Sequence, residues 1–176
     1  MPLVAEGPRR HSSFPLRLLL ATASLAFALV AAEVVLRFMQ PLGTEFALDA
    51  TNGHLPPDLF RDDTELKVTL APEVTVNARG SGSTVQIRTN ALGLRGAPLG
   101  EKAENELRVL ALGDSFTLGM QVAEADTFSA ILSNRLTQVL NRTVVILNAG
   151  VPGYGTDQAR ISMERLVKTT QADAVL

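Results

Sequence analysis

The sequence has no cysteine and no tryptophan, and only one tyrosine and two histidines among its 176 residues. Without cysteine there is no disulfide, no thiolate nucleophile, no cysteine-ligated zinc site and no acylated lipoprotein cysteine. The formal net charge is only -2, and few aromatic rings are present to stack on bases, so no nucleic-acid partner is expected. No pattern of metal ligands is evident, and neither a metal ion nor a cofactor is predicted.

Charged residues are missing from residues 18–32, which follow Arg9, Arg10 and Arg17. A helix over residues 16–38 would be about 34 Å long, enough to cross the hydrocarbon core of a bilayer. Basic residues on its N-terminal side favour a cytoplasmic N-terminus, with everything after about Met39 outside the cytoplasm. The sequence therefore predicts a basic cytoplasmic segment (1–15) and a single transmembrane helix or signal anchor (16–39).

Two other interpretations of this segment fit less well. A cleaved signal peptide is possible because residues 30–32 (VAA) are small enough for a peptidase, but the apolar residues 34–36 (VVL) that follow favour a retained span. A buried helix of a soluble protein would show polar residues at helical spacing, whereas residues 18–32 contain only Thr22 and Ser24. A membrane anchor is the preferred interpretation.

Residues 40–100 are rich in glycine, proline, threonine, aspartate and asparagine, and they predict a small β-rich connector. Its β-prone runs are residues 66–70, 74–76 and 84–88. An Asn-Gly turn signal at residues 52–53 is expected to place His54 in an exposed loop. The Gly-Ser repeat at residues 80–83 is a flexible break, and a domain boundary is expected near residue 100.

Residues 101–176 alternate between strand and helix patterns, as parallel α/β sheets do. The expected elements are strands at 107–112, 143–147 and 174–176, and helices at 127–140 and 157–168. Asp126 is predicted to cap the first helix and Asn141 to end it. Because the sequence ends in the third strand, the sheet is expected to be truncated there and unfinished.

Residues 113–117 (GDSFT) come directly after the first of these strands. A serine at the carboxyl end of a parallel strand lies in the crevice where α/β sheets bind ligands, near backbone N–H groups that favour negative charge. Ser115 is therefore a candidate nucleophile, and its own N–H is a candidate oxyanion donor. A serine nucleophile needs a base, usually histidine, yet His11 and His54 both lie far upstream.

Residues 113–119 (GDSFTLG) and 148–153 (NAGVPG) resemble two sequence blocks of the SGNH/GDSL hydrolases. The resemblance covers residues 107–176, and residues 90–96 (NALGLRG) more loosely resemble the lead-in of membrane-anchored members. It implies a flavodoxin-like three-layer parallel sheet. It also implies ester hydrolysis through a Ser115 acyl-enzyme, acting on an ester or acylated envelope substrate.

The resemblance also implies roles for the neighbours of Ser115. The N–H of Gly153 would be a second oxyanion donor, Asp114 would order the turn and Asn148 would brace the second loop. The family further has an asparagine in a third block and an Asp-x-x-His pair, and neither is in this sequence. The chain is thus expected to be the N-terminal part of a longer protein and inactive by itself, since loss of a triad member costs several orders of magnitude in rate.

Other interpretations of the serine block fit less well. Ser115 could be a simple helix N-cap. An α/β-hydrolase elbow needs a second glycine where Thr117 stands. The order His54, Asp62 or Asp63, Ser115 matches chymotrypsin-like proteases, but those enzymes are all-β, unlike the alternating pattern around Ser115.

The remaining alternatives concern the second loop and the function. Residues 150–155 (GVPGYG) have the spacing G-x-x-G-x-G, which differs from the dinucleotide-binding G-x-G-x-x-G. Residues 141–143 (NRT) match a glycosylation acceptor by chance in a helix-to-strand turn. The main rival function is a membrane-anchored binding or envelope-assembly protein that keeps the SGNH fold without catalysis.

Overall fold

The computed structural model describes residues 14–39, 54–79 and 84–176. The chain divides into two units, Met1–Gln40 and Pro41–Leu176. The first unit holds helix α1 (Phe14–Met39), in which Arg17–Phe38 has a mean hydropathy of 2.2 and no buried residue. The predicted helix is confirmed as one long and apolar enough to span a membrane, a property that signal sequences share. Most of the predicted cytoplasmic segment lies outside the described residues.

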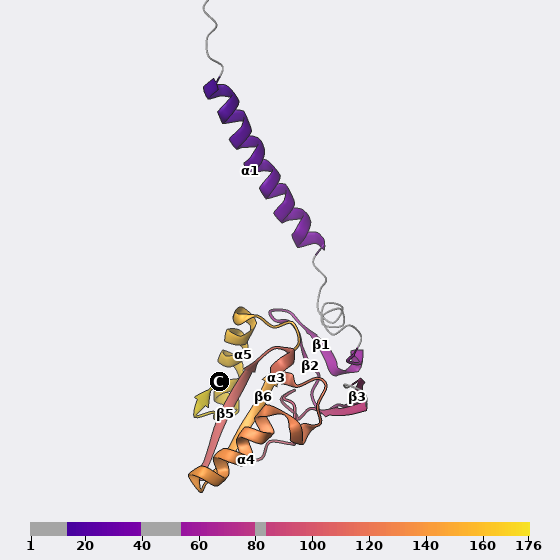
Figure 1. The fold of residues 1–176 in the computed structure, drawn as a ribbon, viewed down its shortest axis with the longest axis vertical. Helices are drawn as coiled ribbons and strands as arrows, with labels where there is room; N and C mark the ends of the chain where they lie inside the picture. The colour runs from indigo at the N-terminus through magenta and orange to yellow at the C-terminus, as the bar shows by residue number, and fades with distance from the viewer. Residues whose placement is uncertain (1–13, 40–53, 80–83) are drawn as a thin grey trace, which may run out of the picture. The chain divides into compact units, whose positions relative to one another are not determined.

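The second unit is built around a three-stranded parallel sheet, shown in Figure 1. Strand β5 (Glu106–Gly113) lies in the centre, between β6 (Thr143–Gly150) and β7 (Ala174–Val175). The register pairs Gly113 with Gly150, so β5 and β6 end at the same edge of the sheet. The predicted alternation of strands and helices is confirmed, and β6 runs three residues beyond its expected end.

Two helices cover opposite faces of this sheet. Helix α4 (Phe128–Leu140) packs through Leu132 and Leu136 on the face that carries Ala111, Val144 and Ile146. Helix α5 (Thr156–Thr169) packs through Leu166 on the face that carries Leu110, Leu147 and Ala149. Successive residues of a strand point to opposite faces, which explains why continuously apolar strands suit a sheet covered on both sides.

The predicted connector forms two hairpins. Strand β1 (Phe60–Asp63) pairs with β2 (Lys67–Leu70), and β3 (Thr75–Arg79) pairs with β4 (Thr84–Arg88). A short 3-10 turn, η1 (Pro57–Leu59), precedes β1. Buried side chains of the hairpins share one hydrophobic cluster with Leu118, Val151 and Tyr154. The hairpins therefore pack against the loops that follow β5 and β6.

Two local predictions in the second unit were wrong. His54 lies in a loop, as expected, but it is half-buried and not exposed: its carbonyl accepts a hydrogen bond from Arg79 N at 2.9 Å, and Leu55 beside it is buried. The Asn-Gly turn before it lies outside the described residues. Thr127 caps α4 in place of Asp126, accepting from Ala130 N, since Asp126 belongs to the 3-10 turn η2 (Glu124–Asp126). Asn141 ends α4 in a left-handed conformation, as predicted.

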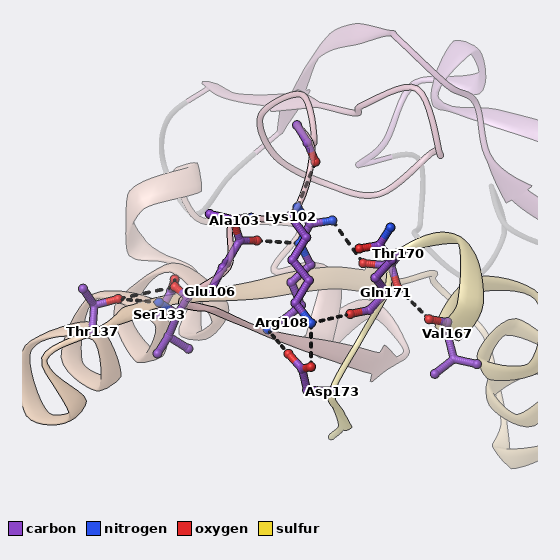
Figure 2. Close-up of polar contacts among 12 residues, drawn as sticks. Lys102, Ala103, Glu106, Arg108, Ser133, Thr137, Val167, Thr170, Gln171 and Asp173 are labelled. Carbon is purple, nitrogen blue, oxygen red and sulfur yellow. Dashed lines mark hydrogen bonds and ion pairs between the residues drawn. The ribbon is translucent and has the colours of Figure 1, made fainter.

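A polar network ties together the opposite end of the sheet, where β5 begins (Figure 2). The buried Arg108 guanidinium pairs with Glu106 at 2.5 Å and donates to the carbonyls of Gly100 and Thr170. Burial raises the pKa of Glu106, but hydrogen bonds from Arg108 and Ala103 N outweigh it, so the pKa lies below its ordinary value. The carboxylate stays charged and anchors the start of the strand.

Candidate functional site

Ser115 is the first residue of a one-turn helix, α3 (Ser115–Leu118), which follows β5 directly. We call α3 the serine helix. The cap of this helix is Asp114, whose Oδ1 accepts a hydrogen bond from Phe116 N at 2.9 Å. The interpretation of Ser115 as the N-cap is therefore wrong. Within the described residues Ser115 Oγ makes no hydrogen bond, and the half-exposed side chain lines an open cleft. Its hydroxyl is not used to hold the turn together.

The last residue of β6, Gly150, touches the backbone of the serine helix and of Asp114, its cap. A Cβ added at Gly150 would lie 2.7 Å from Thr117 C and 2.9 Å from Asp114 O, and closer still to Leu118 N. Real Cβ atoms essentially never approach backbone so closely. In addition, Val151 N donates to Gly113 O at 3.0 Å. The loop after β5 and the loop after β6 therefore leave the sheet in direct contact. Glycine is required at the point where these two loops meet.

Asn148 links the same two loops through its side chain. The residue is 2% exposed. Its Nδ2 donates to Thr117 O at 2.7 Å and to Ser129 Oγ at 3.2 Å, while Oδ1 accepts from Gly150 N at 3.1 Å. The side chain thus contacts the second loop, where its bracing role was predicted, and also the serine helix and α4. Both polar atoms of its side chain have protein partners.

Gly153 lies in the loop after β6, exposed and with a φ of 82° that favours glycine. The next residue, Tyr154, fixes this loop to the β1–β2 hairpin, because its buried hydroxyl donates to Val68 O at 2.7 Å. Burial raises the pKa of Tyr154 to about 12. In the described part of the chain no hydrogen bond uses the Gly153 N–H. Gly153 follows β6 at the same edge of the sheet as Ser115, which follows β5.

Arg95 is a positioning residue that the sequence analysis missed. It is 5% exposed, and its backbone N donates to Asn148 O at 3.0 Å. Its guanidinium donates to three carbonyls, those of Leu118 and Gly119 at 2.6 Å each and of Val122 at 2.7 Å. Burial lowers the pKa of Arg95, an effect partly offset by Glu124. One buried cation thereby clamps the end of the serine helix to the edge of β6.

No family model matches the chain, and no curated protein matches it.

The described residues do not supply a base for Ser115. Among residues 54–79 and 84–176, no histidine or carboxylate makes a hydrogen bond to its hydroxyl. The chymotrypsin-like order is not assembled through Asp63, because Arg165 Nη1 binds that carboxylate at 2.8 Å. Nor do the residues that the structure describes contain a group of three side chains able to hold a metal ion. Within the described residues, the Ser115 hydroxyl therefore has neither a base nor a metal site beside it.

The lowered pKa of Asp63 predicts that the protein loses stability in acid. Hydrogen bonds from Arg165, and from Leu66 N and Glu65 N, hold the pKa of Asp63 well below its ordinary value. A lowered pKa contributes stability that is present above about pH 4 and lost as the pH falls further, because the unfolded state takes up the proton first. Asp63→Asn is expected to lower the free energy of unfolding by about 1 kcal/mol at pH 7, a value reduced by the partial exposure of Arg165.

The measurement is chemical denaturation of the full chain and of Asp63→Asn at pH 7 and pH 3, followed by circular dichroism. The difference between the two proteins is expected to shrink at pH 3. A difference that stays the same at both pH values would contradict a role for the Asp63 charge.

Proposed function

We propose that this chain carries the nucleophile of an exported, membrane-anchored SGNH-type ester hydrolase that acts through a serine acyl-enzyme. The observation that carries the proposal is the Ser115 hydroxyl. It lies at the carboxyl end of the central parallel strand, with its turn capped by Asp114 and its oxygen free of hydrogen bonds within the described residues. A helix-capping serine would have used that oxygen. A nucleophile must keep it available.

The order of the strands supports a flavodoxin-like arrangement. In chain order β5, β6 and β7 are the first, second and third strands of the sheet, and their spatial order is second, first, third. The flavodoxin-like order 2-1-3-4-5 begins in the same way. Ligands of such sheets bind outside the carboxyl ends of the strands, at the point where the order reverses beside the first strand. Ser115 follows that strand.

The proposed reaction begins with attack of Ser115 Oγ on the carbonyl carbon of an ester. The carbonyl oxygen becomes an oxyanion, which the N–H groups of Ser115 and Gly153 would stabilise, each by about 3 kcal/mol. The alcohol then leaves, and water attacks the acyl-enzyme to release the acid. The resemblance to SGNH hydrolases implies that a histidine of an Asp-x-x-His pair moves the protons and that an asparagine is a further oxyanion donor, all from residues outside the described part.

The N-terminal helix supports a location at a membrane. Helix α1 follows a basic segment, and such segments stay in the cytoplasm. The second unit would then lie outside the cytoplasm, where the substrate would be an ester or acylated component of the cell envelope.

A non-catalytic binding or envelope-assembly protein with the same fold is the second candidate. One observation favours it, namely that no base contacts Ser115 among the described residues. The two candidates differ in whether the serine becomes a nucleophile in the protein as its own cells produce it.

Covalent labelling distinguishes the two candidates. Native membranes that contain the protein are treated with a fluorophosphonate, which reacts with activated serines. Labelling and ester hydrolysis are expected, and Ser115→Ala should abolish both. The control is Thr156→Ala, which removes an exposed hydroxyl at the start of α5. Absence of labelling and of hydrolysis in native membranes would refute the enzyme and favour binding.

A further inference from the structure

The Ser115 side chain opens onto a cleft that its role as a nucleophile does not explain. The cleft has a volume of about 420 Å³, within the range of small-molecule sites. Its walls come from the serine helix, the turn after it and the start of α4. The lining residues are Ser115, Phe116, Gly119, Met120, Gln121, Val122, Thr127 and Phe128. None of them carries a charge, so the cleft suits an uncharged and mainly apolar group.

Large apolar side chains around this cleft are exposed to solvent. Phe116 is 87% exposed, although it follows the nucleophile directly, and Phe128 and Val122 are 41% and 38% exposed. The Phe116 N–H is held by Asp114, so the turn that positions Ser115 also fixes the backbone that carries the Phe116 ring. An exposed apolar surface beside a reactive group indicates a binding site for an apolar part of the substrate.

Hydrogen bonds hold the walls of the cleft in place. Arg95 donates to the carbonyls of Gly119 and Val122, and thereby fixes both ends of the turn between them. Thr127 Oγ1 donates to Glu124 O at 2.8 Å and accepts from Ala130 N. The cleft is therefore formed before anything binds, which reduces the entropy that binding would cost.

Resting on the proposed function, we infer that this cleft binds the acyl chain of the ester, so that the site prefers alkanoyl chains of several carbons over acetyl. An ester carbonyl placed at Ser115 would direct its chain along the uncharged walls. A sugar ring fits less well, because it needs many hydrogen-bond partners. Only Gln121 and Thr127 offer polar side chains besides Ser115, and the Thr127 hydroxyl is already engaged.

Binding to the cleft can be measured without catalysis. The full chain, in lipid nanodiscs and with carbon-13 methionine methyl groups, is titrated with linear primary amides from propanamide to octanamide. Met120 lines the cleft, whereas Met163 lies on α5 and serves as an internal control. The Met120 signal is expected to shift, with an affinity that rises about twofold per methylene, less than full burial would give. The Met163 signal should stay in place.

Variants separate the cleft from general lipid partitioning. Val122→Asp and Phe128→Ser change exposed side chains and should weaken octanamide binding at least tenfold. The matched control Val139→Ser, a residue 78% exposed near the end of α4, should leave it unchanged. The inference is overturned if affinity does not depend on chain length, if a sugar acetate binds better than octanamide, or if the Met120 signal moves with protein concentration alone, which would mean that a second copy covers the cleft.

Failure of this inference and failure of the proposed function give different results. If amides titrate Met120 but the fluorophosphonate never labels Ser115, the cleft binds chains and the hydrolase proposal fails. If Ser115 is labelled but Met120 shows no dependence on chain length, the hydrolase proposal stands and the acyl-chain cleft is wrong.

Discussion

Gly150→Ala is expected to lower the free energy of unfolding of the second unit by about 3 kcal/mol or more, a large effect for one methyl group. The added Cβ would collide with backbone atoms of Thr117, Asp114 and Leu118, none of which is the end of a flexible side chain. Relief requires moving β6 away from the serine helix. That movement would strain the hydrogen bonds from Asn148 to Thr117 and from Val151 N to Gly113. Stability and the position of Ser115 should be lost together.

The measurement is urea denaturation of the full chain in mild detergent, followed by circular dichroism, with hydrogen exchange of residues 113–127 as a local readout. Gly100→Ala is a matched control, because a Cβ at Gly100 meets nothing within 4 Å. It should change stability by less than about 0.5 kcal/mol. Equal effects of the two substitutions would show that β6 and the serine helix are not in tight contact.

The sheet and its helices were predictable from sequence because their signals are local. Residues 143–147 (TVVIL) are nearly all apolar, as expected for a strand covered on both faces, and α4 carries apolar residues at helical spacing. Strand β1 (Phe60–Asp63) was missed because three of its four residues are charged. It forms through pairing with β2, and only its first residue, Phe60, is buried. No local pattern carries that information.

The candidate site, too, could be predicted from the sequence only in part. The positions of Ser115 and Asp114 at a strand-to-helix turn followed from neighbouring residues. The contact between Gly150 and the serine helix did not, because it depends on the register of β5 against β6, which places Gly150 beside Gly113. Arg95 could not be predicted as a site residue either, because its role depends on contacts with residues distant in the sequence. Its three carbonyl partners lie 23 to 27 residues away, and nothing in residues 90–96 (NALGLRG) specifies them.

Arg95→Leu is the second substitution with a large expected effect. It changes the free energy of unfolding in two opposing ways. Removing a buried cation that has no hydrogen-bonded carboxylate relieves a desolvation cost. Against this, the carbonyls of Leu118 and Val122 lose their donor, whereas Gly119 O keeps its hydrogen bond from Val122 N at 3.2 Å. An unsatisfied buried group costs about 1–3 kcal/mol. Two losses outweigh one gain, so we expect a net destabilisation of about 2 kcal/mol, with faster hydrogen exchange in residues 115–127.

Two variants test whether the guanidinium fork itself is needed. Arg95→Lys keeps the charge, but a single ammonium cannot reach three carbonyls in the way that a planar guanidinium can, so it should recover only part of the loss. The control Arg88→Leu removes a nearby exposed arginine whose ion pair with Glu124 spans 3.2 Å, and it should cost less than about 1 kcal/mol. Full recovery by lysine would mean that charge alone holds the serine helix. A loss for Arg95→Leu no larger than that for Arg88→Leu would mean that the clamp does not hold it.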